Sequence, residues 1–130
     1  NRIFLARGNS ASRQYNEDEL IKISRNFGFR PISLEKMALR ESVQVLATAE
    51  AVIGPHGAGW ANAMFAQPGT PALLWSWPGA RHDNWFSNIG ALADLDMTVR
   101  FLPDGQAASY DVPPQLFSRW LADMSLPVAP

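Results

Sequence analysis

Short apolar runs alternate with longer amphipathic segments along the chain. The short runs have the length and the apolar residues of buried strands. They cover residues 3–7, 29–33, 51–54, 71–77 and 97–102. Such alternation predicts a parallel sheet covered by helices on both faces, with right-handed crossovers. The expected fold is therefore α/β: a Rossmann-like, three-layer α/β/α sandwich with a mostly parallel five-stranded sheet.

The amphipathic segments predict the helices between these strands. They cover residues 16–28, 34–49, 58–66, 84–95 and 114–124. One face of the first helix carries Leu20, Ile21, Ser24 and Phe27, and one face of the second carries Met37, Leu39, Val43, Leu46 and Ala47. Asn16 is a good N-cap residue with Glu19 three positions later, and Gly28 suits the end of the first helix.

Composition limits the possible functions. The chain has 130 residues, of which 47% are hydrophobic, and this fits a single globular domain over residues 1–130. A net charge of −1 gives no electrostatic reason to expect nucleic acid or an anionic membrane as a partner. No apolar run is long enough to span a membrane. Because there is no cysteine, disulfides and thiolate metal sites are excluded, and we expect a reducing, cytoplasmic location.

The chain opens at Asn1 and enters a strand at once. This start is typical of a piece cut from a longer protein, and we expect a further domain before it.

The most informative stretch is VIGPHGAGWAN, residues 52–62. A predicted strand ends at Gly54 and a helix opens at Gly59, and ligands of open α/β sheets bind outside the carboxyl ends of strands. Glycines allow close approach of backbone to a ligand, and free amides at a helix start bind anions. The pattern favours a phosphate or diphosphate, with His56 donating to it or transferring a proton and Asn62 within reach. In the alternative interpretation, the glycines serve only the turn and His56 caps the helix.

Other chemistries have less support. The spacing is not G-x-G-x-x-G, and there is no Walker lysine. The segment HGAG resembles a lipase oxyanion loop, but the sequence has no G-x-S-x-G nucleophile elbow. His56 and His82 are too few for a zinc site, and His82-Asp83 is interpreted as a solvated turn. We expect neither a metal nor a cofactor.

Several of these motifs together resemble the family-61 glycosyltransferases of capsule and exopolysaccharide biosynthesis. Members show an arginine after the first strand, then R…NE.EL, then GPHGAGLTN, then F..PG. The corresponding residues here are Arg7, Arg13, Asn16-Glu17, Gly54 to Asn62, and Phe65 with Pro68-Gly69. The resemblance extends from about Ile3 to about Pro78.

This resemblance implies a metal-independent, nucleotide-sugar-dependent transferase of the GT-B architecture, in which the C-terminal of two Rossmann-like domains holds the donor. The chain would be that C-terminal half. Its partners would be a nucleotide-sugar donor, a glycan acceptor and the missing N-terminal domain, which would supply the catalytic base. The isolated fragment would then be inactive. The alternatives are a non-catalytic nucleotide-binding or assembly module, and a hydrolase.

The resemblance also implies roles for individual residues. It shifts the expected role of His56, the candidate catalytic residue, from proton transfer towards orienting a phosphate. It assigns donor or phosphate binding to Arg7, Arg13, Asn16, Glu17, Gly57, Ala58, Gly59 and Asn62. Without a metal, Arg7 and then Arg13 are the best cations for the leaving diphosphate. The alternatives are an N-cap role for Asn16, a helix-dipole role for Glu17, a surface ion pair for Arg7 and plain solvation for Arg13.

The sequence departs from the family pattern at three places. Ser42 stands where members commonly carry glutamine, and Trp60-Ala61 replaces Leu-Thr in the glycine loop. Leu74 or Trp75 occupies a position that often holds glutamate. We expect Trp75 and Trp77 to belong to the core, the alternative being that they stack on a base.

Overall fold

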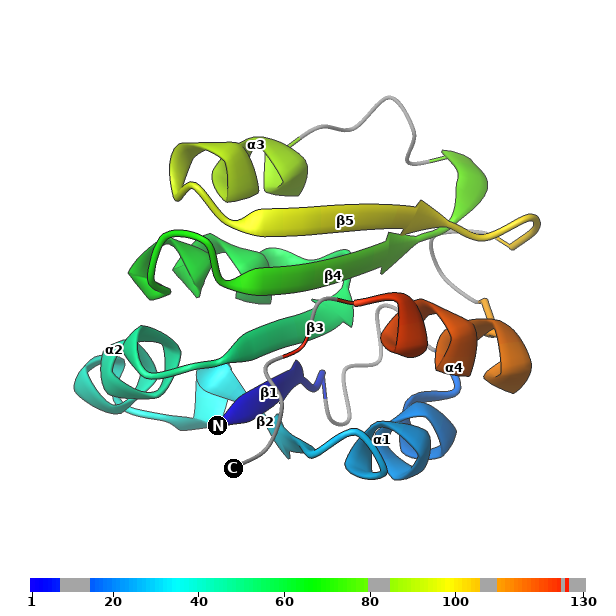
Figure 1. The fold of residues 1–130 in the computed structure, drawn as a ribbon, viewed down its shortest axis with the longest axis horizontal. Coiled ribbons are helices and arrows are strands. Elements are labelled where there is room, and N and C mark those ends of the chain that lie inside the picture. The colour runs from blue at the N-terminus through cyan, green and yellow to red at the C-terminus, as the bar shows by residue number, and fades with distance from the viewer. Residues whose placement is uncertain (8–14, 80–84, 106–109, 125, 127–130) are drawn as a thin grey trace.

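A single parallel sheet organises the molecule (Figure 1). The computed structural model describes residues 1–7, 15–79, 85–105, 110–124 and 126. The strands are β1 (Arg2–Leu5), β2 (Phe29–Ile32), β3 (Ala51–Pro55), β4 (Pro71–Ser76) and β5 (Asp96–Phe101). They lie in the order β2-β1-β3-β4-β5, and every pair of neighbours is parallel. The predicted Rossmann-like α/β fold is confirmed, with a sheet that is parallel throughout.

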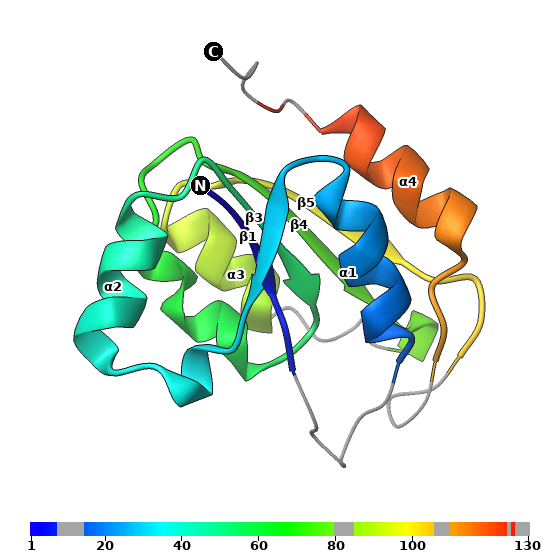
Figure 2. The ribbon, with the colours of Figure 1, turned by 90° about the horizontal axis from the view of Figure 1, so that it is seen from below.

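Helices cover both faces of the sheet (Figure 2). The α-helices are α1 (Glu17–Arg25), α2 (Leu39–Ala47), α3 (Trp85–Leu92) and α4 (Pro114–Asp123). Two 3-10 helices are η1 (Leu34–Lys36) and η2 (Ala58–Phe65). Helices α1 and α4 lie on one face, and α2 and α3 lie on the other, where both pack against η2. The result is the expected three-layer sandwich, in which none of the described helices is long and apolar enough to cross a membrane.

Two local expectations are wrong, and the short helix expected over residues 58–66 is present in the 3-10 form. The helix expected over residues 34–49 is split into η1 and α2, because Met37 between them is extended. As a result Leu39 begins α2 with 69% of its surface exposed instead of joining the apolar face. The helix expected over residues 58–66 is a 3-10 helix, which opens with a bond from the Trp60 amide to the Gly57 carbonyl. Helix α1 ends at Arg25, and Gly28, with φ of +84°, leads into β2.

The core consists of two apolar layers, one on each side of the sheet. Under α1 and α4 the buried residues include Phe4, Leu20, Ile53, Trp75, Phe117 and Leu121. Under α2 and η2 they include Ile3, Leu5, Leu46, Val52, Trp60 and Leu74. Because successive side chains of a strand point to opposite faces, β1 and β3 contribute to both layers. Trp75 is fully buried, which confirms its predicted place in the core, whereas Trp77 is only partly buried against the same layer.

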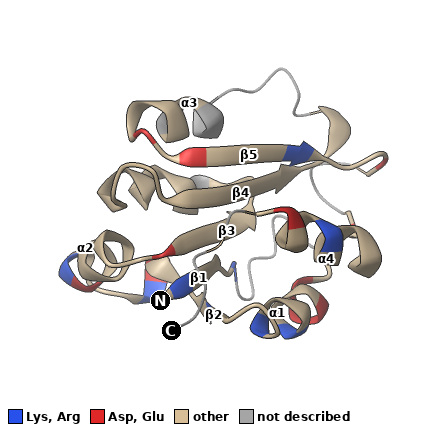
Figure 3. Cartoon of the chain, in the orientation of Figure 1, with Lys and Arg blue, Asp and Glu red and all other residues tan. Residues whose placement is uncertain are grey.

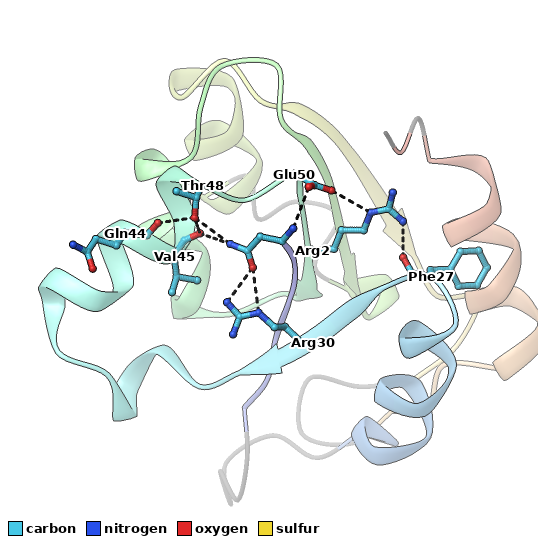
Figure 4. A network of polar contacts seen from close by, with 8 residues as sticks. Arg2, Phe27, Arg30, Gln44, Val45, Thr48 and Glu50 are labelled. Atoms are coloured by element: carbon cyan, nitrogen blue, oxygen red, sulfur yellow. Dashed lines mark hydrogen bonds and ion pairs between the residues drawn. The ribbon is translucent and has the colours of Figure 1, made fainter. Parts of the chain in front are cut away.

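At the amino edge of the sheet, charged side chains are engaged within the protein (Figure 4). Arg2 Nη1 donates to the Phe27 carbonyl at 2.7 Å, and Arg2 Nε lies 3.7 Å from a carboxylate oxygen of Glu50. The guanidinium of Arg30 donates to the side-chain oxygen of Asn1. Elsewhere charges of both signs lie on helices and at strand ends, and the central strands β3 and β4 carry none (Figure 3).

Candidate functional site

The order in which strands are added to the sheet changes direction at β1. The next strand, β2, lies on one side of β1, and β3 and the later strands lie on the other side. The connection from β1 to β2 runs over the face of α1, and the connection from β3 to β4 runs through η2 on the opposite face. The segments that leave the carboxyl ends of β1 and β3 therefore diverge. In sheets of this strand order, such a topological switch point is where ligands bind. The residues that follow the two strands are Ala6-Arg7 and His56-Gly57.

Arg7 connects the two sides of the switch point. Its backbone amide donates to Glu17 Oε2 at 2.8 Å, and its guanidinium Nη2 donates to the backbone carbonyl of His56. The guanidinium carbon lies 5.7 Å from the centre of the Tyr15 ring, in cation–π range. Arg7 is thus held at its backbone amide and at its guanidinium, which also contacts the Tyr15 ring.

The second terminal nitrogen of Arg7 has no hydrogen-bond partner in the part of the chain that the structure describes. Nη1 is buried, yet it donates to no acceptor among the described residues. Nor does a carboxylate of the described chain form an ion pair with this guanidinium, so the surface ion pair considered for Arg7 is not formed there. An unpaired buried donor is costly, and more so when it is charged. This nitrogen therefore suits an acceptor that the described residues do not supply.

Gly54 in β3 and Gly57 after it are required for space and not for backbone conformation. None of Gly54, Gly57 and Gly59 lies in the left-handed region, and Gly57 is extended with φ of 167°, so a left-handed turn conformation does not explain them. A Cβ on Gly54 would lie 2.8 Å from Leu5 Cβ, where β1 and β3 are adjacent. A Cβ on Gly57 would lie 3.1 Å from Arg7 Nη2. Gly59 is exposed, and a Cβ there would meet only Leu5 Cδ1, at 4.0 Å, so its backbone is open to approach.

His56 is held between the ends of β3 and β4. Its amide donates to the Trp75 carbonyl at 2.7 Å, its carbonyl accepts from Arg7, and only 4% of its surface is exposed. The ring meets Trp77 edge to face, with 4.9 Å between centroids. The N-cap position of η2 belongs to Gly57, so the interpretation of His56 as the N-cap residue is wrong.

Asn16 and Glu17 lie at the start of α1 beside Arg7. Asn16 occupies the N-cap position, but its side chain forms no capping bond, which is contrary to the expectation. Its amide nitrogen instead donates to the Val112 carbonyl, and its oxygen accepts from the Val112 amide, both at 2.8 Å. Glu17 Oε2 accepts from the Tyr15 hydroxyl at 2.6 Å in addition to Arg7.

Tyr15 supports this cluster. Its ring stacks on Tyr110 with 5.6 Å between centroids and 15° between planes. Burial, and then the charge of Glu17, raise the pKa of the Tyr15 hydroxyl above its usual range, so the hydroxyl stays protonated and donates to the carboxylate. Tyr15, Tyr110 and Val112 were missed by sequence reasoning. Only Tyr15 carried a signal, as an aromatic residue directly before the Asn-Glu pair.

The structure brings most of the predicted residues together. Hydrogen bonds join Arg7 to His56 and to Glu17, Gly57 follows His56, and Asn16 precedes Glu17. Ala58 and Gly59 open η2, and the partly buried Asn62 follows one turn later. Arg13 and the His82-Asp83 pair lie outside the described residues. The ligand roles assigned to these positions stay predictions.

Comparison with protein families gives a match in this same region. The model of the family described as glycosyltransferase 61 matches residues 1–73, which is more than half of the chain. The chain belongs to the glycosyltransferase 61 family. A search of curated proteins found no match.

Membership in the glycosyltransferase 61 family implies glycosyl transfer. The matched region runs from β1 into β4 and so includes Arg7, the start of α1 and the whole glycine stretch. Tyr110 and Val112 lie beyond it. The family match and the switch-point geometry thus indicate the same edge of the sheet.

Proposed function

We propose that the chain is the donor-binding domain of a GT-B-type glycosyltransferase of polysaccharide biosynthesis, acting on a nucleotide sugar and a glycan acceptor. One observation carries this proposal: at the switch point, the fixed guanidinium of Arg7 has a buried nitrogen without an acceptor in the described chain. A diphosphate is rich in acceptor oxygens and carries the complementary charge. Guanidinium groups pair with phosphate oxygens through directed hydrogen bonds.

The glycine loop completes the proposed phosphate site. Gly57 keeps the backbone close to Arg7, and Gly59 leaves the start of η2 uncovered. The amides of residues 57–59 would donate to the same diphosphate, as amides at helix starts do. His56 would orient a phosphate oxygen, Asn62 would reach the donor from the next turn, and Arg13 would supply a second cation.

Transfer of the sugar would follow from this arrangement. The acceptor hydroxyl attacks the anomeric carbon and gives its proton to a base, which we place in a preceding N-terminal domain. The bond from the anomeric carbon to the donor phosphate oxygen breaks, and its electron pair leaves with the nucleoside diphosphate. Arg7 and the loop amides stabilise the negative charge that develops on that oxygen.

Calorimetric titration of the chain with uridine and guanosine diphosphates tests the donor site. We expect saturable binding of at least one of them, and binding of the matching nucleoside at least about tenfold weaker, because the phosphate contacts carry the affinity. The matching sugar transfer would be measured on the full-length protein. The absence of heat with either diphosphate at millimolar concentration would contradict the donor site. Binding without transfer would indicate a non-catalytic module instead.

A further inference from the structure

We propose that Tyr15, Asn16 and Glu17 are positioning residues, which set Arg7 and the segment before α4 in place around the switch point. We call these three residues the bracket. The inference rests on the proposed function, because it assigns the bracket a role in building the diphosphate site without contacting the ligand. It also differs from the ligand roles that the family resemblance implies for Asn16 and Glu17.

Glu17 fixes the base of the Arg7 side chain. A single carboxylate oxygen, Oε2, accepts from both the Arg7 amide and the Tyr15 hydroxyl, at 2.8 and 2.6 Å. Hydrogen bonds to a charged acceptor are stronger than neutral ones. A carboxylate would also repel a diphosphate in direct contact, since both are negative. Glu17 is therefore better suited to hold Arg7 than to hold a phosphate.

Tyr15 holds the guanidinium through a cation–π contact. Its hydroxyl is tied to Glu17, and one side of its ring lies 5.7 Å from the guanidinium carbon. The same ring stacks on Tyr110, which belongs to the segment before α4. Through this one aromatic ring, the orientation of Arg7 depends on residues near the other end of the chain.

Asn16 fixes that segment directly. Its side-chain amide pairs with the backbone of Val112 in both directions, in the manner of two residues in adjacent strands. Val112 is buried, and Tyr110 lies two residues before it. Asn16 thereby sets the distance between Tyr110 and the start of α1. At that distance Tyr15, the residue before Asn16, stacks on Tyr110. The three consecutive bracket residues thus join β1, α1 and the segment before α4.

A double-mutant cycle between Glu17 and Arg7 separates positioning from direct contact. We expect Glu17→Ala to weaken binding of uridine diphosphate and of pyrophosphate by about tenfold. In the Arg7→Ala background the same change should have almost no further effect, because Glu17 acts through Arg7. Glu17→Gln keeps an acceptor oxygen and should restore most of the affinity. Asp18→Ala is the matched control, since it removes an exposed carboxylate from the same first turn of α1.

Two outcomes of the cycle would overturn the inference. One is equal weakening by Glu17→Ala with and without Arg7, which would show that Glu17 contacts the ligand itself. The other is full affinity of Glu17→Ala in the otherwise unchanged chain. Absence of binding by the unsubstituted chain would instead overturn the proposed function.

Amide hydrogen exchange tests the bracket without any ligand. We expect Glu17→Ala to speed exchange of the Arg7 amide at least about tenfold, and Glu17→Gln and Asp18→Ala to leave it nearly unchanged. Asn16→Ala should do the same to the Val112 amide. Because Asn16→Ala tests the bracket at a different amide, it gives an answer even if Glu17→Ala does not fold. Unchanged protection of both amides in the alanine variants would contradict the bracket whatever the ligand.

Discussion

Replacing Arg7 by alanine is expected to weaken binding of uridine diphosphate by about tenfold to a hundredfold, which corresponds to the loss of charge-assisted hydrogen bonds. The reason is geometric. The guanidinium already uses Nη2 for the His56 carbonyl and lies over Tyr15, and its buried Nη1 has no acceptor among the described residues. Titration calorimetry of the variant and the parent chain measures the change.

Two further variants make this result specific. Arg7→Lys keeps the charge but has one nitrogen, which cannot serve both the His56 carbonyl and a phosphate, so we expect it to recover only part of the affinity. Arg40→Ala removes an exposed arginine from α2 and should bind like the parent chain. Equal affinities of Arg7→Ala and Arg40→Ala would contradict the role of Arg7. Melting temperatures of all variants show whether each remains folded.

Replacing Trp75 by alanine is expected to lower the free energy of unfolding by about 3–5 kcal/mol. Trp75 is fully buried, and its indole contacts the rings of Phe4, Phe117 and Tyr15 at centroid distances of 5.7, 5.2 and 6.4 Å. Truncation would open a cavity between the sheet and α4 that rigid neighbours fill only in part. Urea denaturation followed by circular dichroism measures the change.

The matched control for this prediction is Met64→Ala on η2. Met64 is 61% exposed, so its truncation should change the free energy of unfolding by no more than about 0.5 kcal/mol. A loss below about 1 kcal/mol for Trp75→Ala would show that the layer under α4 is packed differently from the structure.

The fold was predictable because its signals are local and repeated. Each strand is a short apolar run and each helix an amphipathic one, so the order of elements follows from the pattern. The split of residues 34–49 was not predictable in this way. Met37 and Leu39 fit a helical period, and only the packing of the chain shows that Met37 is extended and Leu39 exposed.

The candidate site was predictable in part. The positions of Arg7 and His56 after strands follow from the pattern and the family resemblance, because strand ends of a parallel sheet share one edge. The role of Asn16 did not follow from the sequence. An asparagine before a helix has the same sequence pattern whether its side chain caps the helix or pairs with the distant Val112. Val112 is separated from Asn16 by 96 positions, and no local signal connects the two. The glycines were interpreted as allowing close approach to a ligand, which stays a prediction; the structure shows instead that Gly54 lies against Leu5 and Gly57 against Arg7.

The family match and the bracket together describe how the site is assembled. The matched residues 1–73 contain Arg7, the bracket and the glycine stretch. The bracket then reaches outside that region to Tyr110 and Val112. The segment before α4 therefore contributes to the site as a support for groups that the family region supplies.

The most direct test of the central claim is a nuclear magnetic resonance titration of the isotope-labelled chain with uridine diphosphate, followed at the Arg7 guanidinium and the Gly57 amide. The account predicts that both signals shift together and saturate at the same ligand concentration as the phosphorus signals of the diphosphate. Saturable binding that leaves Arg7 and Gly57 unperturbed would contradict a diphosphate site at the carboxyl ends of β1 and β3.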